Sequence, residues 1–373
     1  MHVPLLDLTL QHREIRDEVL AAVTSVIDRQ QFIMGPEIAV LEAAVAELCR
    51  TSHGIACASG TDALLLPLKG LELQPGDEVI VPAFTFFASA GAVANAGGTP
   101  VFVDIDPVSF NLAPAAVEAV ITPRTRAIVV VHLFGQMAPI EAILALAERR
   151  GIPVIEDAAQ AIGARRRIGG QWRMAGELGW AGTLSFFPTK NLGGYGDGGM
   201  IVTSDPSTAG RLARLRLHGG AKQYHHDEIG TNSRLDSLQA AVLLAKLPYL
   251  AGWSAARRAR AARYATGLAD LVGIQTPGTD PENEHIFHQY TVRAERRDAL
   301  QAYLRAREIG SAIYYPVPLH LQPCFAHLGY DRGRLPETER ATDQVLSLPV
   351  YPELTDAQQD WVIDSIRAFY AKR

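Results

Sequence analysis

One lysine occupies an unusual place in this sequence. Lys190 lies in the stretch SFFPTKNLGGYGDGG, between an apolar run and a loop in which five of seven consecutive residues are glycine. Its amine can lose a proton and form a Schiff base with an aldehyde, which an arginine guanidinium cannot do. Lysine is otherwise rare, because only 5 of the 35 basic residues are lysine. We expect Lys190 to carry covalent chemistry and the others to be surface charges, namely Lys69, Lys222, Lys246 and Lys372.

Two groups of residues have the chemistry of a phosphate site. Ser59, Gly60 and Thr61 follow the apolar run HGIACA and open a helical pattern, so they offer free backbone N–H groups at the positive end of a helix. Ser185 follows another apolar run and adds a hydroxyl group. A simple helix cap would explain the first group equally well.

A carboxylate and an amide follow a third apolar run. Asp157 ends the stretch IPVIED, and Gln160 lies three residues further on. A carboxylate there can hold a protonated ring nitrogen, because a close opposite charge stabilises the charged form. A helix cap or a structural ion pair is the alternative. A phosphate cradle, a partner for a pyridinium and a lone amine are together what a protein needs to hold pyridoxal phosphate.

These residues require a scaffold that brings strand ends together. Short apolar runs alternate with helical patterns such as residues 138–151, which predicts a mainly parallel sheet covered by helices. In such sheets ligands bind beyond the carboxyl ends of the strands, where the candidate residues lie. The expected strands fall within residues 53–58, 77–84, 99–106, 126–134, 152–158, 183–188 and 199–204.

The pattern changes in the last third of the chain. An arginine-rich helix over residues 252–268 is expected to lead into a second, smaller domain. There the sequence predicts a strand at 289–295, a helix at 296–309, a strand at 311–317 and a closing helix. Length also favours two domains, which we place at residues 1–250, with an N-terminal helical segment, and 251–373.

Composition excludes several classes of protein. A net charge of −5 argues against a nucleic-acid-binding protein. The 3 cysteines are too scattered for a disulfide framework or a metal site, so no metal is expected. The N-terminus lacks a secretory signal pattern, and every apolar run is interrupted by polar residues or proline, so neither export nor membrane insertion is expected. These features predict a cytoplasmic protein.

Six stretches in this order resemble the DegT/DnrJ/EryC1/StrS family of sugar aminotransferases. They are SGTDAL, PAFTFFA, VFVDID, EDAAQAIGA, SFFPTKNLGGYGDGG and GTNSRLDSLQAA, and the resemblance extends from about Leu6 to Pro352. It implies an α/β protein of the pyridoxal-phosphate-dependent transferase fold type I, which is aspartate aminotransferase-like. A seven-stranded, mainly parallel sheet would form the large domain and an α+β unit the small one. The resemblance also implies a homodimer whose active sites are built from both subunits.

The resemblance assigns roles to residues by their positions in these stretches. Lys190 matches the lysine that binds the cofactor covalently, and Asp157 matches the partner of the pyridine nitrogen. Phe86 matches the aromatic residue that covers the cofactor ring, with Phe84 as the alternative and core packing as the other role for either. The remaining matches are Gln160 beside the ring hydroxyl, Gly60, Thr61 and Ser185 at the phosphate, and Asn232 at the phosphate of the neighbouring subunit.

Two details separate this chain from some relatives. Ile162 stands where many members have a histidine, so a polar contact from that position is missing. A dehydratase branch of the family replaces the covalent lysine by histidine, whereas Lys190 is intact and favours transamination.

The resemblance implies glutamate as amino donor and a nucleotide-diphosphate keto sugar as acceptor. The stretches AKQYHHDEIGTNSRLD and SAIYYPVPLHLQPCF are most similar to a branch that aminates C3 of a UDP-linked 2-acetamido-3-keto hexuronic acid for surface polysaccharides. Arg234 could meet the sugar carboxylate with its two-donor fork, or pair with Asp227 or Asp236 instead. Candidate contacts to sugar or diphosphate are Tyr314, Tyr315 and His320, although the tyrosines could equally be strand packing.

Three other functions fit parts of the sequence. Amination at C4 of a dTDP- or UDP-linked 4-keto-6-deoxy sugar is the rival within the family. A nicotinamide-dependent oxidoreductase requires a glycine fingerprint after the first strand, where this chain has ASGTDAL. A non-enzymatic regulator that retains the fold would be favoured by loss of Lys190 or by a DNA-binding appendage, and the sequence has neither feature.

Overall fold

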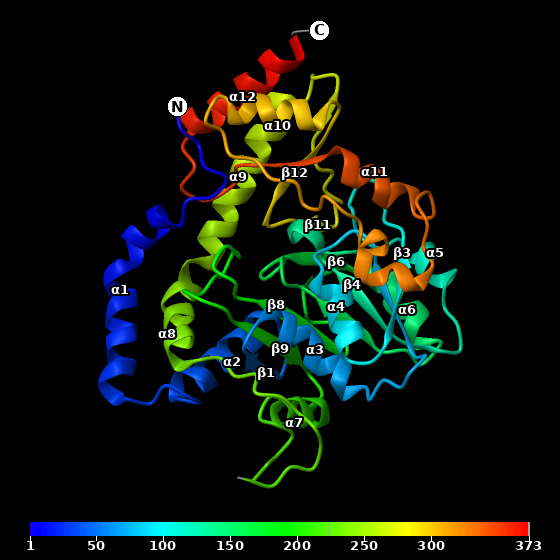
Figure 1. Cartoon of the computed structure of the whole chain (residues 1–373). Coiled ribbons are helices and arrows are strands. Elements are labelled where there is room, and N and C mark those ends of the chain that lie inside the picture. The colour runs from blue at the N-terminus through cyan, green and yellow to red at the C-terminus, as the bar shows by residue number, and fades with distance from the viewer. Residues whose placement is uncertain (223, 372–373) are drawn as a thin grey trace.

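A large sheet forms the centre of the molecule (Figure 1). The computed structural model describes residues 1–222 and 224–371. Within these residues seven strands form the large sheet, and β9 alone runs antiparallel to the others. The prediction of a seven-stranded, mainly parallel sheet is therefore confirmed. In spatial order the strands are β1 (His53–Cys57), β9 (Gly199–Thr203), β8 (Ala181–Ser185), β5 (Val154–Asp157), β4 (Thr125–Val131), β2 (Glu78–Pro82) and β3 (Thr99–Val103).

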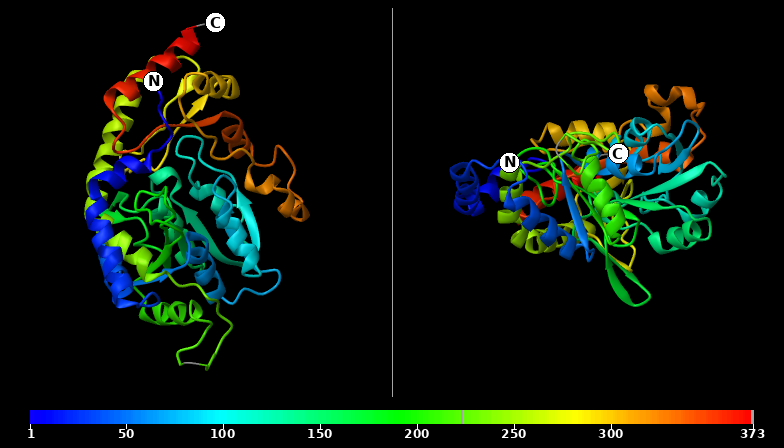
Figure 2. Two further views of the ribbon diagram at one scale, coloured as in Figure 1. Left: turned by 60° about the vertical axis from the view of Figure 1, so that its left-hand side comes forward. Right: turned by 90° about the horizontal axis from the view of Figure 1, so that it is seen from below.

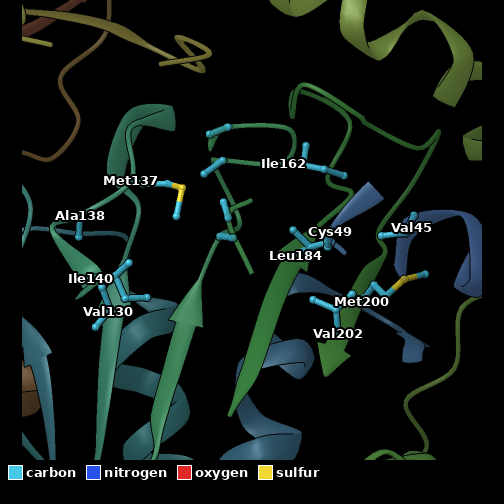
Figure 3. Packing of buried hydrophobic residues seen from close by; sticks show 14 of the residues in the cluster. Val45, Cys49, Val130, Met137, Ala138, Ile140, Ile162, Leu184, Met200 and Val202 are labelled. Carbon is cyan, nitrogen blue, oxygen red and sulfur yellow. The ribbon is translucent and has the colours of Figure 1, made fainter. Parts of the chain in front are cut away.

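Helices bury both faces of this sheet, which is why its strands are continuous apolar runs. In β4, Ile128 and Val130 enter one hydrophobic cluster, whereas Val129 and Val131 enter the cluster on the opposite face. Figure 3 shows part of the first cluster, with Leu184 and Met200 among its side chains. The first face is covered by α2 (Pro36–Leu48), α5 (Pro114–Glu118), α6 (Ile140–Glu148) and α8 (Ser237–Lys246), and the second by α3 (Gly60–Gly70), α4 (Ala88–Asn95) and α7 (Pro206–Leu215).

Short polar side chains and proline determine where several helices begin. Asp7 accepts a hydrogen bond from the Thr9 backbone N–H at 2.9 Å and caps α1 (Leu8–Arg29). Ser59 caps α3 in the same way, and Pro36 occupies the first turn of α2, where its missing N–H has no helical partner to lose. Figure 2 shows α1 beside α8 along one side of the molecule, and α1 lies in the N-terminal segment that was expected to be helical.

A second core lies at the end of the molecule where both termini are found (Figure 1). Its antiparallel sheet consists of β10 (Ile274–Gln275), β12 (Tyr290–Ala294) and β13 (Val345–Leu348). Val3 belongs to this core, and its backbone bonds Glu308 and Gly310 at 2.9 and 2.8 Å. The helices that surround it or follow it in the chain are α9 (Leu250–Leu268), α10 (Arg297–Arg305), α11 (Pro336–Gln344) and α12 (Asp356–Ala371).

Several short elements connect the two cores. The 3₁₀ helices are η1 (Leu133–Gly135), η2 (Leu247–Tyr249), η3 (Leu319–Leu321) and η4 (Pro323–Leu328). A separate small sheet joins β11 (Asn283–Glu284) to the hairpin of β6 (Arg165–Ile168) and β7 (Gln171–Met174). Val3, from the N-terminal part of the chain, packs in the second core. In the other direction β11, from the C-terminal part, pairs with β6 of the N-terminal part. The division of the chain into domains at residue 250 stays a prediction. The last two residues of the predicted second domain, Lys372 and Arg373, lie outside the described residues.

Two predictions for secondary structure were wrong or incomplete. Residues 311–317 form no strand beyond an isolated bridge between Ala312 and Ser347, and β13 takes the place expected for them. Their tyrosines instead face the large domain, where Tyr315 bonds Gln160. The β6–β7 hairpin was missed, although its Gly169–Gly170 turn, with φ of 57° and 81°, is a recognisable hairpin signal.

Candidate active site

The candidate residues meet at one edge of the sheet. Asp157 and Ser185 are the last residues of the adjacent parallel strands β5 and β8. Lys190 follows in the loop after β8, and Gly60 opens the helix after β1. The parallel arrangement thus gathers, from distant parts of the chain, the groups that the sequence suggested would act together.

Lys190 is a partly buried residue at the end of the sheet. Burial lowers the pKa of Lys190 to about 8, and the nearby Asp157 carboxylate partly offsets this effect by raising it. Among the described residues, no group forms a hydrogen bond with the Lys190 Nζ atom. The backbone N–H of Lys190 donates to the Phe187 carbonyl at 2.8 Å, which holds the turn in place. An amine with these properties is partly neutral near pH 8 and can attack an aldehyde.

Asp157 is a buried carboxylate, with 5% of its surface exposed. Burial raises the pKa of Asp157, although hydrogen bonds from Ser89 and Ala159 oppose this increase. Ser89 Oγ donates to Oδ2 at 2.8 Å, and the Ala159 N–H contacts Oδ1 at 3.2 Å. A cation placed against this carboxylate would relieve the cost of its burial. The carboxylate therefore fits a protonated ring nitrogen.

Gln160 is fixed on both sides of its amide. Its Oε1 accepts from the Phe134 N–H at 2.8 Å, and its Nε2 donates to the Tyr315 hydroxyl at 2.9 Å. These two hydrogen bonds fix which end of the amide is oxygen and which is nitrogen. The second N–H of Nε2 has no partner among the described residues. That N–H suits an oxygen acceptor such as a ring hydroxyl.

The start of α3 and the end of β8 form a cradle without side-chain bulk. A Cβ atom on Gly60 would lie 2.6 Å from the Ser185 Cβ, so the helix start packs directly against the serine. The Ser59 side chain caps the helix through the Asp62 N–H at 3.1 Å. Thr61 is exposed at the first turn. Free N–H groups and hydroxyls at a helix N-terminus fit a phosphate group.

Aromatic residues take two different positions near the site. Phe86 is 56% exposed, and its ring centroid lies 6.2 Å from that of Tyr315. Phe84 is 1% exposed and contacts Phe110 and Phe134, so core packing accounts for it. Phe86, rather than the alternative Phe84, is therefore free to cover a bound ring.

The residues predicted to contact the substrate differ in burial. Tyr314 is partly buried beside Tyr315, whose hydroxyl already bonds Gln160. His320 is 1% exposed, and its Nε2 lies 3.2 Å from the Glu339 carboxylate. Burial lowers the pKa of His320, with Glu339 opposing the effect. His320 is thus buried against Glu339 in the single chain, and its contact with the sugar stays a prediction.

Two polar residues of the stretch GTNSRLD lie near the surface. Asn232 is exposed, and its backbone bridges to Leu217. Arg234 is partly buried, and within the described chain it forms no ion pair with Asp227 or Asp236, the partners considered above. Both side chains therefore remain available for contacts with another molecule.

Several supporting residues could not be found from the sequence. Behind Asp157, the His132 Nε2 donates to the Glu156 carboxylate at 2.8 Å, because its Nδ1 accepts from the Ala138 N–H at 3.1 Å. Burial alone would raise the pKa of Glu156, but the hydrogen bonds from His132 and backbone N–H groups outweigh it and lower the pKa. His132 also donates its backbone N–H to the Asp157 carbonyl at 3.0 Å, which fixes the end of β5.

Ile162 and Lys246 are both buried. Ile162 is 4% exposed and belongs to the hydrophobic cluster of which Figure 3 shows a part. The expectation that Lys246 is a surface charge was wrong, because only 3% of this residue is exposed. Lys372 lies outside the described residues.

Across residues 1–222 and 224–371, no cluster of His, Cys, Asp and Glu side chains could hold a metal ion. Nor is any helix in these ranges long and apolar enough to cross a membrane.

Comparison with known proteins agrees with this geometry. The model of the DegT/DnrJ/EryC1/StrS aminotransferase family matches residues 13–367. A Geobacillus stearothermophilus protein named as a pleiotropic regulatory protein is 51% identical and covers 99% of both chains. A UDP-N-acetyl-3-dehydro-alpha-D-glucosamine 3-aminotransferase of Acidithiobacillus ferrooxidans is 48% identical over 95% of both chains. The crystal structure of S. venezuelae DesV with a ketimine intermediate has a TM-score of 0.96 at 47% identity, covering 100% of this chain and 99% of that one. These likenesses confirm the predicted fold type I.

Proposed function

Because the chain belongs to the DegT/DnrJ/EryC1/StrS aminotransferase family, we propose that it moves an amino group from glutamate to C3 of a UDP-linked 2-acetamido-3-keto hexuronic acid. It is an aminotransferase and uses pyridoxal 5'-phosphate, as the enzymes of this family do. The donor, the sugar and the role of each residue are the proposal. The observation that carries it is the partly buried Lys190, whose amine bonds no described residue, near the buried Asp157 carboxylate.

The residues at the sheet edge divide the work of transamination. Bound pyridoxal phosphate supplies an electron sink for the substrate carbon that loses a proton. Lys190 removes that proton as a general base and returns one as a general acid, which its pKa of about 8 allows near neutral pH. Asp157 stabilises positive charge at the ring nitrogen, Gln160 donates to the ring hydroxyl, and Phe86 covers one face of the ring.

The phosphate group of the cofactor would be held by both subunits of a homodimer. Gly60 and Thr61 supply backbone N–H groups at the start of α3, and Ser185 adds its hydroxyl. Asn232 is exposed in a single chain, which suits a contact with the phosphate in the site of a second copy. A dimer of this kind would make each site depend on its neighbour.

The choice of sugar rests on two observations. The relative from A. ferrooxidans is named for amination at position 3 of a UDP-linked N-acetyl sugar, which favours C3 over the C4 alternative. Arg234 has no ion-pair partner within the described residues, and a guanidinium recognises a carboxylate with two parallel hydrogen bonds. Arg234 is therefore the group proposed to select a hexuronic acid over a neutral sugar, with Tyr314 and Tyr315 near the diphosphate-sugar.

Product formation with matched sugars tests this assignment. The purified enzyme, with pyridoxal phosphate and glutamate, is offered the UDP-linked 3-keto hexuronic acid, the neutral 3-keto sugar and a dTDP-linked 4-keto-6-deoxy sugar, and the products are identified by mass spectrometry. We expect the hexuronic acid to be preferred, and Arg234→Gln to lower its kcat/KM by roughly tenfold to 100-fold while leaving the neutral sugar unaffected. Preference for the 4-keto sugar, or equal losses with both 3-keto sugars, would contradict the proposal. Lys190→Ala serves as the inactive control.

The name of the G. stearothermophilus relative keeps a regulatory function as the second candidate. A regulator has no need of an amine with a lowered pKa near a buried carboxylate, so the pair of Lys190 and Asp157 supports the enzyme. Failure to convert any keto sugar, despite bound cofactor and glutamate, would favour regulation instead.

A further inference from the structure

A buried lysine, Lys246, contacts the loop that carries Lys190. Lys246 is the last residue of α8, and its Nζ donates to the Gly193 carbonyl at 2.6 Å. Gly193 follows Lys190 by three residues and is itself buried. Burial of an ammonium group is unfavourable unless specific partners replace the water that it loses. The hydrogen bond from Lys246 to Gly193 is therefore part of the packed fold and not a contact between surface groups.

The surroundings of Lys246 are suited to a cation. Its Nζ lies 5.3 Å from the ring centroid of Tyr195 and 6.0 Å from that of Trp253. Burial lowers the pKa of Lys246 to about 8, and the Glu353 carboxylate partly offsets this by raising it. Two aromatic faces and one distant carboxylate compensate part of the hydration that the ammonium group has lost.

The same helix holds the loop at a second point. Gln239, two turns earlier on α8, accepts from the Tyr195 N–H through Oε1 at 2.8 Å. On the other side of the loop, a Cβ atom on Gly193 would lie 2.3 Å from the Pro188 carbonyl oxygen. The loop is therefore confined between Pro188 and α8. Of the two contacts from α8, the charged one from Lys246 is at Gly193, which is closer in the chain to Lys190 than Tyr195 is.

We propose that Lys246 is a positioning residue that aims the amine of Lys190 by fixing the Gly193 carbonyl. Removal of the Lys246 amine would leave this buried carbonyl without its donor, and the loop would move to find another. The inference rests on the role of Lys190 in the proposed function. Lys246, which was expected to be a surface charge, would then hold the active-site loop from inside the protein.

The test compares Lys246→Met, which keeps the length of the side chain but removes the donor, with Lys69→Met. Lys69 also lies on a helix, and its amine forms no hydrogen bond or ion pair with a described residue, so it controls for loss of a charge. Hydrogen–deuterium exchange of residues 190–198 and the Kd for pyridoxal phosphate are measured on the full-length protein, together with peptide mapping of the borohydride-reduced cofactor adduct. The exchange of β12 in the second core serves as an internal standard.

We expect Lys246→Met to speed exchange in residues 190–198 and to raise the Kd for pyridoxal phosphate by about tenfold, equivalent to about 1.4 kcal/mol. Strand β12 and the Lys69→Met variant should remain unchanged, and Lys246→Arg, which restores a cationic donor, should recover most of the protection. An adduct on Lys190 with unchanged loop exchange and affinity would overturn the role of Lys246 alone. So would an equal loss of protection in the loop and in β12. A wild-type adduct on another lysine would overturn the proposed function and the role of Lys246 with it.

Discussion

The ionisation of Lys190 gives a prediction whose size follows from the structure. With a pKa of about 8 instead of the ordinary 10.5, the neutral fraction of the amine rises from about one tenth at pH 7 to about nine tenths at pH 9. The rate of cofactor capture should therefore rise by about tenfold over this interval and level off above it. An ordinary lysine would gain about 100-fold over the same interval and continue to rise. Asp157 raises the pKa of Lys190, so Asp157→Asn should move the midpoint to lower pH.

Stopped-flow absorbance measures this rate when cofactor-free, full-length protein is mixed with pyridoxal phosphate at pH 6 to 10. A parallel series with N-acetyl-lysine corrects for ionisation of the cofactor itself. A rate that climbs to pH 10 without levelling would refute the idea that burial lowers the pKa of Lys190. A midpoint that rises in Asp157→Asn would refute the charge interaction between the two groups.

Two further substitutions test the cradle and the carboxylate. Gly60→Ala places a Cβ atom 2.6 Å from the Ser185 Cβ, so the Kd for pyridoxal phosphate, followed by fluorescence, should rise by roughly tenfold or more, whereas Gly70→Ala, whose nearest new contact is 3.4 Å, should not change it. Equal affinities for both variants would show that the start of α3 does not hold the phosphate. Ser89→Ala removes the hydroxyl that donates to Asp157 and should lower kcat/KM with glutamate by roughly fivefold to 100-fold. An unchanged value would mean that this hydrogen bond does not support the ring nitrogen.

Much of the scaffold could be predicted because buried parallel strands leave a direct mark on the sequence. Each strand of the large sheet is a short apolar run, and the ends of β5 and β8 place Asp157 and Ser185 at one edge. Residues 311–317 have the same apolar and aromatic character but no strand, because Tyr315 bonds Gln160, 155 residues away in the chain. Tertiary contacts of this range outweigh local preference and leave no local signal.

The supporting residues of the site were missed for the same reason. Ser89 lies in the alanine-rich stretch ASAGAVAN, where nothing indicates a partner 68 residues away. Lys246 closes an ordinary amphipathic helix, and its burial depends on Gly193 and on the rings of Tyr195 and Trp253. A sequence pattern shows which groups can react, whereas the residues that hold those groups in place are found only from the fold.

In the proposed reaction Lys190 binds the cofactor and exchanges protons during transamination. The most direct test records the absorbance of the purified protein with pyridoxal phosphate, then reduces it with borohydride and maps the modified peptide, with and without prior addition of glutamate. We expect a cofactor adduct on Lys190 that prior addition of glutamate prevents from forming. An adduct on Lys246 or another lysine, or a spectrum that glutamate leaves unchanged, would contradict this role of Lys190.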